Sequence, residues 1–207
     1  LDDDNLTHPR LEAVFTTDEE VGMDGAIGLD VSKLKGKYLI NMDSGEEGTL
    51  LISSAGGLTA SCEIPLVHTH VDGLKIQIAI NNLKGGHSGA EIHRNRTNAT
   101  KLLGRLLFDL TKSFDYHLIS IEGGQKDNVI PRDAYAEVCI KTDSYGEFET
   151  LFETLSNRYK SELSMTEPDL TIKAKVFENQ EYKCIDEKTF KNILFYLIHV
   201  PNGVQNM

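Results

Sequence analysis

The order of apolar repeats between residues 74 and 178 limits the fold of this chain more than any other feature. Four segments alternate apolar and polar residues, as half-buried strands do, and two have apolar residues at helical spacing. In chain order they are 74–83 (strand), 98–112 (helix), 116–122 (strand), 134–142 (strand), 148–163 (helix) and 170–178 (strand). The predicted order is therefore β-α-β-β-α-β.

This order is the ferredoxin-like, split βαβ arrangement of an α+β domain. One more helical run, EKTFKNILFYLIHV at 187–200, comes before Pro201 and is expected to end there, because proline disfavours a helical residue before it. The second part of the chain therefore predicts a compact α+β domain.

The first part of the chain has a different pattern. LEAVFTT at 11–17 and KYLINMD at 37–43 are short apolar runs that lead into acids, and the segment between them can hold a short helix or turn. Strand, crossover and strand form the unit of a parallel α/β sheet. Because AGG at 55–57 breaks the pattern, we expect two domains, 1–57 and 58–207.

Composition narrows the classes of function. The net charge of −11 argues against a nucleic-acid-binding surface, since attraction to phosphate needs clustered Lys and Arg. No apolar run approaches the roughly 20 residues of a membrane span. Cys62, Cys139 and Cys184 are far apart and form no CxxC pair, a pattern typical of a reducing cytoplasm. The chain starts at Leu1 rather than Met, and we expect it to be an internal fragment.

Acidic residues follow both predicted strands of the first segment. Glu19 and Glu20 come after the first strand and Asp43 after the second, and ligand sites gather at the carboxyl ends of parallel strands. Carboxylates on a shared rim can bind Zn²⁺, Mn²⁺ or Mg²⁺, and one beside a metal-bound water can act as general base. The alternative is a solvated pair of acidic strand ends without metal.

Three further groups could bind or catalyse. In GGHSG at 85–89 the flanking glycines expose His87, which could donate a hydrogen bond to an oxyanion, although a lone surface histidine often has no role. Asn128 and Arg132, in the turn NVIPR, could hold a substrate carboxylate, or form a plain turn. His68 and His70 share one face of a strand and could bind metal or face solvent.

Five motifs together resemble one enzyme family. They are TTDEEVGMDGA, INMDSGEEG, LKGGHSGAEIH, NVIPRDA and PNGV. In this order and spacing they are similar to the cytosolic aminoacyl-histidine (Xaa-His) dipeptidases. These dipeptidases belong to the co-catalytic zinc peptidases, a group that includes aminoacylases and carboxypeptidase G-like enzymes.

The resemblance implies a zinc-bearing α/β catalytic domain, a lid domain that mediates homodimerisation, and hydrolysis of dipeptides with C-terminal histidine. It implies that Glu19 is the general base, that Glu20 and Asp43 bind one metal each, and that His87 stabilises the oxyanion. Asn128 would help to hold the substrate. Two Zn²⁺ ions would be the cofactors, with Mn²⁺ or Co²⁺ as possible substitutes.

The chain also departs from the family pattern. The remaining metal ligands of the family, an HxD histidine, a bridging aspartate and a final histidine, would lie outside residues 1–207. Where many relatives carry an arginine after the NVIP turn, this chain reads Cys139-Ile140-Lys141, so Arg132 is a substitute candidate. The alternative function is a non-catalytic, ferredoxin-like dimerisation or binding module. A magnesium-dependent phosphohydrolase is a weaker third hypothesis, since no glycine-rich phosphate loop is present.

Overall fold

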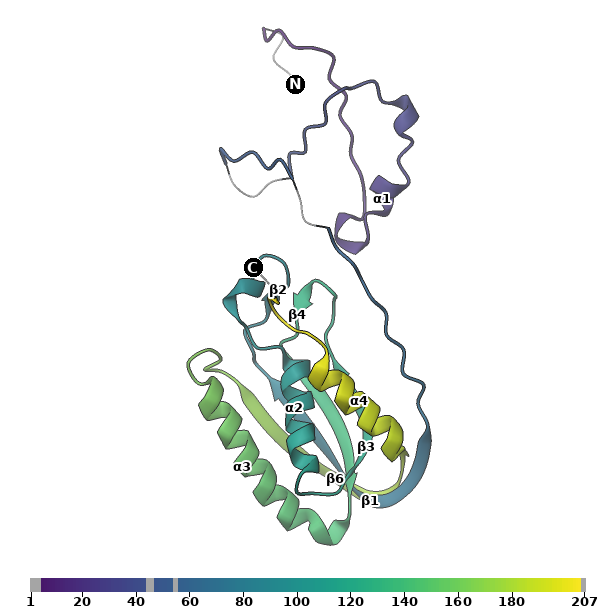
Figure 1. The fold of residues 1–207 in the computed structure, drawn as a ribbon, viewed down its shortest axis with the longest axis vertical. Helices are drawn as coiled ribbons and strands as arrows, with labels where there is room; N and C mark the ends of the chain where they lie inside the picture. The colour runs from purple at the N-terminus through teal and green to yellow at the C-terminus, as the bar shows by residue number, and fades with distance from the viewer. Residues whose placement is uncertain (1–4, 44–46, 54–55, 206–207) are drawn as a thin grey trace. The chain divides into compact units, whose positions relative to one another are not determined.

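The structure is a computed structural model that describes residues 5–43, 47–53 and 56–205. The chain divides into two compact units, Leu1–Thr59 and Ala60–Met207, and each is described by itself (Figure 1). The break expected at 55–57 lies partly outside the described residues. No helix in the described part of the chain has the length and apolar character needed to cross a membrane.

The second unit has the predicted order of elements. They are β1 (His68–Asn81), α2 (Ala99–Thr111), β3 (His117–Gly123), β5 (Ala134–Ile140), α3 (Tyr145–Leu163) and β6 (Thr171–Ile185). These strands form one four-stranded sheet in the order β3-β5-β1-β6, and every neighbouring pair is antiparallel. The ferredoxin-like α+β prediction is confirmed. The predicted last helix is α4 (Glu187–His199).

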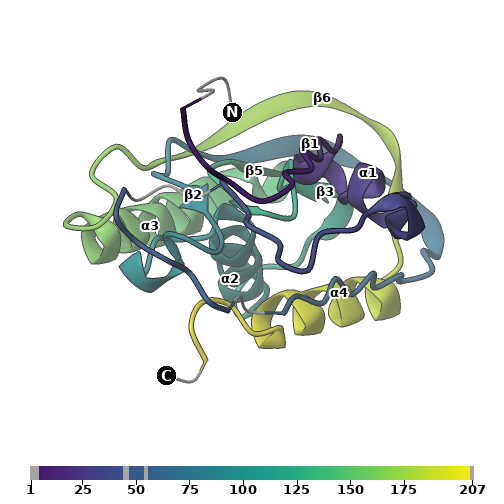
Figure 2. The same ribbon diagram turned by 90° about the horizontal axis from the view of Figure 1, so that it is seen from above.

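The core lies between the sheet and its helices. Ile76, Ile78 and Ile80 alternate along β1 and are fully buried, because residues two apart share one face of a strand. The buried leucines of α2 include Leu103 and Leu106. Figures 1 and 2 show α2, α3 and α4 on one face of the sheet. The alternation and helical spacing seen in the sequence therefore describe the two layers of this core.

Side chains fix the helix ends. Asn98 caps α2 by accepting a hydrogen bond from the Lys101 amide at 3.2 Å, and Asp186 caps α4 through the Thr189 amide at 3.1 Å. The ammonium group of Lys101 donates to the carbonyl oxygens of Leu197, Ile198 and Val200, at the end of α4. These carbonyls lack helical partners, so Lys101 joins the start of α2 to the end of α4.

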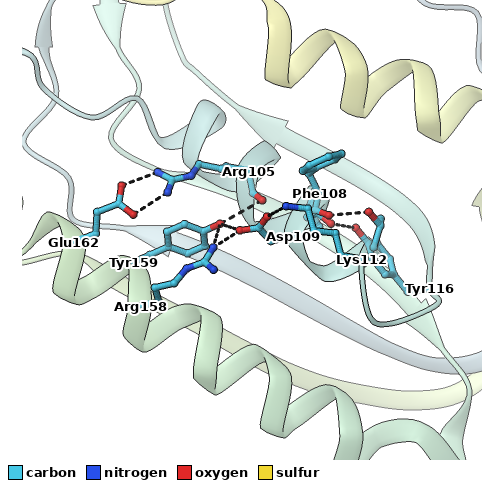
Figure 3. A network of polar contacts seen from close by, with 10 residues as sticks. Arg105, Phe108, Asp109, Lys112, Tyr116, Arg158, Tyr159 and Glu162 are labelled. Atoms are coloured by element: carbon cyan, nitrogen blue, oxygen red, sulfur yellow. Dashed lines mark hydrogen bonds and ion pairs between the residues drawn. The ribbon is translucent and has the colours of Figure 1, made fainter.

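A polar network joins α2 to α3 (Figure 3). Arg105 forms a two-point ion pair with Glu162, at 2.8 and 2.7 Å. The carboxylate of Asp109 accepts hydrogen bonds from the Tyr159 hydroxyl and from Arg158. Tyr159 is fully buried, so its hydroxyl needs this partner.

β6 lies at one edge of the sheet. It pairs with β1 on one side, and in the described sheet no strand pairs with its other side. Much of β6 is exposed, and it carries Lys173, Lys175 and Lys183.

The first unit has little regular structure. It contains 3-10 helices at Glu19–Val21 and Val31–Lys33 and the short helix α1 (Asp24–Ile27), in agreement with the expected helix or turn between the two apolar runs. Residues 11–17 and 37–43 form no strand, so the expected parallel sheet is absent from the described residues. A strand requires a paired neighbour, and in the described part of this unit neither run has one.

The apolar side chains of these two runs are exposed. Phe15 and Tyr38 are each 93% exposed and Met42 is 90% exposed. The carboxylate of Glu12 links the two halves of the unit by accepting hydrogen bonds from the amides of Lys35 and Gly36, at 2.8 and 2.9 Å. Polar contacts of this kind, rather than a buried apolar core, order the described part of the unit.

Candidate functional site

The predicted base and its neighbour lie in one acidic turn. Glu19 and Glu20 begin the 3-10 helix Glu19–Val21, and both are exposed. Asp18 precedes them in the left-handed conformation, and its carbonyl accepts hydrogen bonds from Val21 and Met23. Successive residues on a 3-10 helix are about 120° apart. The two carboxylates therefore leave the turn in different directions, as separate roles for them would require.

Asp43, the second predicted metal ligand, is exposed in an extended segment, and its amide donates to the side chain of Asn41 at 2.8 Å. Within the part of the chain that the structure describes, no group of three or more His, Cys, Asp or Glu residues is arranged to hold a metal ion. Glu20 and Asp43 alone therefore do not fit a complete dinuclear site, which needs more ligands than two carboxylates.

His87, Asn128 and Arg132 are brought together at one end of the sheet. A two-stranded ladder pairs β2 (Gly86–His87) with β4 (Val129–Ile130), in the register His87 opposite Val129. The Ser88 amide donates to the carbonyl of Asn128 at 2.8 Å. Two predicted motifs more than 40 residues apart in sequence thus form one site, which we call the His87 loop (residues 85–91) with its NVIPR support (residues 128–132).

The imidazole of His87 is held by the backbone that follows it. Nδ1 accepts hydrogen bonds from the amides of Gly89 and Ala90, at 3.0 and 3.1 Å. Because amide nitrogens are donors, Nδ1 must present its lone pair, and in the neutral ring the proton is then on Nε2. His87 is exposed, and among the described residues no hydrogen bond involves Nε2. The loop therefore offers Nε2–H as a free donor.

Glu91 and Arg96 form an ion pair behind this loop. Glu91 Oε2 accepts the amide of His87 at 3.1 Å, and Oε1 lies 2.7 Å from Arg96 Nη2 and 3.2 Å from Arg94 Nη1. Arg96 also donates to the carbonyl of Gly85. The His87 amide, together with the charges of Arg96 and Arg94, lowers the pKa of Glu91. Glu91 is therefore ionised, and its carboxylate holds the His87 amide and Arg96 in place.

Two glycines of the GGHSG motif make room for these contacts. Gly86 has φ +141°, and a Cβ atom there would overlap the side chains of Glu91 and Arg96. A Cβ atom at Gly89 would lie 3.3 Å from both Nδ1 and Cε1 of His87. The motif thus needs glycine at 86 for backbone conformation and space, and at 89 for close approach to the imidazole.

The two predicted substrate-binding residues support the loop. Arg132 Nε donates to the carbonyl of Leu83 at 2.9 Å. The side-chain oxygen of Asn128 is buried, and it has no hydrogen-bond partner among the described residues. A buried acceptor without a donor costs about 1–3 kcal/mol, so the hydrogen-bonding capacity of this atom is unused among the described residues.

Sequence reasoning did not identify Glu91, Arg96 or Glu167 as part of this site. Glu167 is 98% buried, and its carboxylate accepts the amides of Lys84 and Thr97, at 2.8 and 3.0 Å. It therefore holds both ends of the segment that contains the His87 loop. No local pattern in the sequence indicates this role, since its partners lie 83 and 70 residues away.

His68 and His70 are exposed at the start of β1. His70 lies opposite Lys183 of β6 in the antiparallel register. Neither histidine belongs to a metal-binding group in the described residues.

Comparison with known families defines the class of the second unit. Residues 78–166, from β1 into the turn after α3, match the family model of the peptidase dimerisation domain. The end of β1, the strands β3 and β5, the helices α2 and α3 and the His87 loop lie within this match, whereas β6 follows it. The segment thus has the fold and the sequence pattern of a domain through which peptidases dimerise.

Two relatives extend the similarity across both units. The chain is 36% identical over 206 residues to the cytosol non-specific dipeptidase of Escherichia coli strain K12, a match that covers 99% of this chain and 42% of that protein. The crystal structure of aminoacylhistidine dipeptidase from Vibrio alginolyticus matches 93% of this chain and 39% of that chain, with 30% identity and a TM-score of 0.69.

These matches confirm the resemblance to aminoacyl-histidine dipeptidases that the motifs indicated. The chain spans about two fifths of the length of each of these relatives.

Proposed function

We propose that this chain acts as part of a longer, metal-dependent dipeptidase that hydrolyses dipeptides with a C-terminal histidine. The observation that carries the proposal is the 36% identity to a dipeptidase, which extends over 206 residues and therefore over both units. The aminoacylhistidine dipeptidase from Vibrio alginolyticus supports histidine at the C-terminal position. The name of the Escherichia coli relative, a non-specific dipeptidase, indicates a broader choice of dipeptides as the alternative.

Residues 1–57 would then be part of the catalytic domain, and residues 58–207 the lid through which two copies form a homodimer. The exposed apolar side chains of the first unit support this division, because a complete sheet would cover them. The name of the Escherichia coli relative supports a cytoplasmic location.

In the proposed reaction, Glu19 acts as general base and takes a proton from the attacking water. The water oxygen forms a bond to the carbonyl carbon of the peptide, and the carbonyl oxygen becomes an oxyanion. His87 donates the hydrogen bond from Nε2–H to this oxyanion. When the C–N bond breaks, Glu19 returns this proton to the leaving nitrogen.

Metal binding is the role proposed for Glu20 and Asp43, with one Zn²⁺ ion each and Mn²⁺ or Co²⁺ as substitutes. The two carboxylates do not complete a site by themselves, so the proposal requires further ligands from elsewhere in the enzyme. Elemental analysis of the 207-residue chain, after zinc saturation and desalting, should find almost no zinc. One or two tightly held zinc ions would contradict this assignment and direct attention to His68 and His70.

Substrate binding is the role proposed for Asn128 and Arg132. The buried oxygen of Asn128 can accept a hydrogen bond from an N–H group of the dipeptide. Arg132 uses Nε to bind Leu83, and its remaining guanidinium nitrogens can pair with the substrate carboxylate.

Replacing Glu19 in the full-length enzyme tests the proposal. Glu19→Gln should lower kcat at least 100-fold, since general-base catalysis contributes about 10²–10⁴-fold. Glu63→Gln, at an exposed glutamate of the second unit, is the control and should leave kcat unchanged. Unchanged hydrolysis of Xaa-His dipeptides by the Glu19 variant would exclude its role as the base. Hydrolysis by the 207-residue chain alone would also contradict the proposal.

The match to the peptidase dimerisation domain favours a second candidate function, a non-catalytic dimerisation module. On this hypothesis the chain self-associates without any metal. Sedimentation of the 207-residue chain, with and without a chelator, measures this association. A dimer in both conditions, together with a full-length protein that cleaves no dipeptide, would favour the module over the enzyme.

A further inference from the structure

The turn after His87 is closed by hydrogen bonds in both directions. The amide of Glu91 donates to the carbonyl of His87 at 3.0 Å, and the carboxylate of Glu91 accepts the amide of His87 at 3.1 Å. Between these two residues lie Gly89 and Ala90, whose amides donate to Nδ1 of the imidazole. The carboxylate of Glu91 therefore closes the turn that carries both donors.

Arg96 extends this closure to the other side of His87. It pairs with Glu91 at 2.7 Å and donates to the carbonyl of Gly85, two residues before His87. The side chain of Arg96 is only 19% exposed and that of Glu91 is 26% exposed. One partly buried ion pair thus spans the loop from Gly85 to Glu91, and the imidazole is the exposed group within it.

We propose that Glu91 is a positioning residue that fixes His87 as the Nε2–H tautomer and directs that N–H outward as a hydrogen-bond donor. The assignment of this donor to the oxyanion rests on the proposed dipeptidase function, whereas the tautomer follows from the loop alone. A ring that turned over would place Cδ2 in the position of Nδ1, against the amides of Gly89 and Ala90, and lose their hydrogen bonds. Glu91 acts by keeping those amides in place.

The chemistry requires a fixed donor rather than a proton carrier. When water adds to the peptide carbonyl, the electron pair of the C=O bond moves onto oxygen, and Nε2–H can stabilise the negative charge without giving up its proton. The other ring nitrogen cannot exchange roles with it, because its lone pair already accepts two hydrogen bonds. The loop therefore prepares the donor before substrate binds, which avoids reorganisation during the reaction.

Nuclear magnetic resonance of the 207-residue chain tests the tautomer directly. In protein labelled with ¹⁵N, scalar couplings across the two N–H···N hydrogen bonds should connect Nδ1 of His87 with the amide nitrogens of Gly89 and Ala90. The His87 signals are assigned by their loss in His87→Gln. A wild-type ring that carries its proton on Nδ1 would overturn the proposal.

Variants of the ion pair test the role of Glu91. Glu91→Ala and Arg96→Gln should each abolish the couplings and populate the Nδ1–H tautomer. Glu162→Ala, which removes a similar two-point arginine pair between α2 and α3, should leave them unchanged. Arg96→Gln keeps the carboxylate and serves if Glu91→Ala unfolds. Couplings that persist in a folded Glu91→Ala or Arg96→Gln chain would overturn the proposal.

Kinetics of the full-length enzyme separate this proposal from the proposed function. His87→Ala should lower kcat about 100-fold. Glu91→Ala should lower kcat about 10-fold with little change in KM. Loss of the residues that orient metal-bound histidines in other enzymes has an effect of about this size. A normal kcat in Glu91→Ala with a low kcat in His87→Ala would contradict positioning by Glu91. A normal kcat in His87→Ala would contradict the role of His87 in the proposed function, and the tautomer would still be decided by the couplings.

Discussion

Gly89 places its amide 3.0 Å from Nδ1 of His87, and a β-carbon at this residue would lie 3.3 Å from the ring. Gly89→Ala should therefore displace the imidazole while changing the free energy of unfolding by less than about 1 kcal/mol, because the loop is exposed. The measurements are the couplings to Nδ1 and urea denaturation. Gly146→Ala is the control for the couplings, since a β-carbon there meets nothing within 4 Å. Unchanged couplings in Gly89→Ala would contradict the need for glycine.

Glu167 is the residue that holds the two ends of the His87 segment. Glu167→Ala removes the acceptor for the amides of Lys84 and Thr97 and should cost about 2 kcal/mol of stability, since each lost partner costs about 1–3 kcal/mol where water cannot replace it. Glu167→Gln keeps one oxygen acceptor and should cost less. Urea denaturation of the 207-residue chain measures both. Equal stability of Glu167→Ala and the wild type would show that water replaces the carboxylate.

The sequence indicated some of these residues and not others for a physical reason. His87 stands between glycines, and Asn128 stands in a turn, so both could be recognised from their neighbours. Glu167 acts on amides 83 and 70 residues away, and Glu91 acts on a turn whose shape appears only after β2 and β4 pair. The partners of Glu167 are distant in sequence, and the contact of Glu91 with His87, four residues away, depends on the folded turn, so neither glutamate stands out in the sequence.

The helices α2 and α3 are joined by a network that depends on pH. Burial works to raise the pKa of Asp109, but hydrogen bonds from Lys112 and Tyr159 and the charges of Lys112 and Arg158 outweigh it, so the pKa is lowered. A lowered pKa stabilises the folded state above the unfolded-state value, which is about 3.9 for aspartate. This stabilisation is lost as the pH falls below that value and through the folded-state pKa.

Asp109→Asn should therefore remove part of the acid sensitivity of the second unit. We expect the free energy of unfolding of the wild type to fall more steeply than that of the variant as the pH is lowered from about 5 to about 2. Urea denaturation at several pH values measures this difference. Asp115→Asn, at an exposed aspartate, should behave like the wild type. Parallel pH profiles for Asp109→Asn and the wild type would show that the network contributes nothing at acid pH.

At the element scale, the sequence predicted the strands and helices whose apolar residues repeat at a regular spacing. The strands and helices from β1 to α4 each bury one face, so alternation and helical spacing identified them. The apolar runs at 11–17 and 37–43 have the composition of strands but are unpaired in the described residues. Composition can indicate a strand, but a segment forms a strand only when a neighbouring segment forms hydrogen bonds with its backbone.

The two units of the whole molecule differ in what stabilises them. The buried hydrophobic residues of the described chain all belong to the second unit, within residues 76–197. Deleting residues 1–59 should therefore leave the midpoint of thermal unfolding of residues 60–207 within a few degrees of the whole chain, about the shift caused by 1 kcal/mol or less. Calorimetry measures this midpoint. A loss of cooperative unfolding in the shortened chain would show that the second unit needs the first.

The edge strand β6 has a consequence for handling the protein. An exposed strand with one unpaired side offers its backbone to any other extended chain, and natural proteins reduce this risk by placing lysine there. Lys173, Lys175 and Lys183 stand along this strand. Their charges repel one another when strands of different molecules meet, so added salt, which screens that repulsion, is the condition under which a concentrated sample should first become turbid.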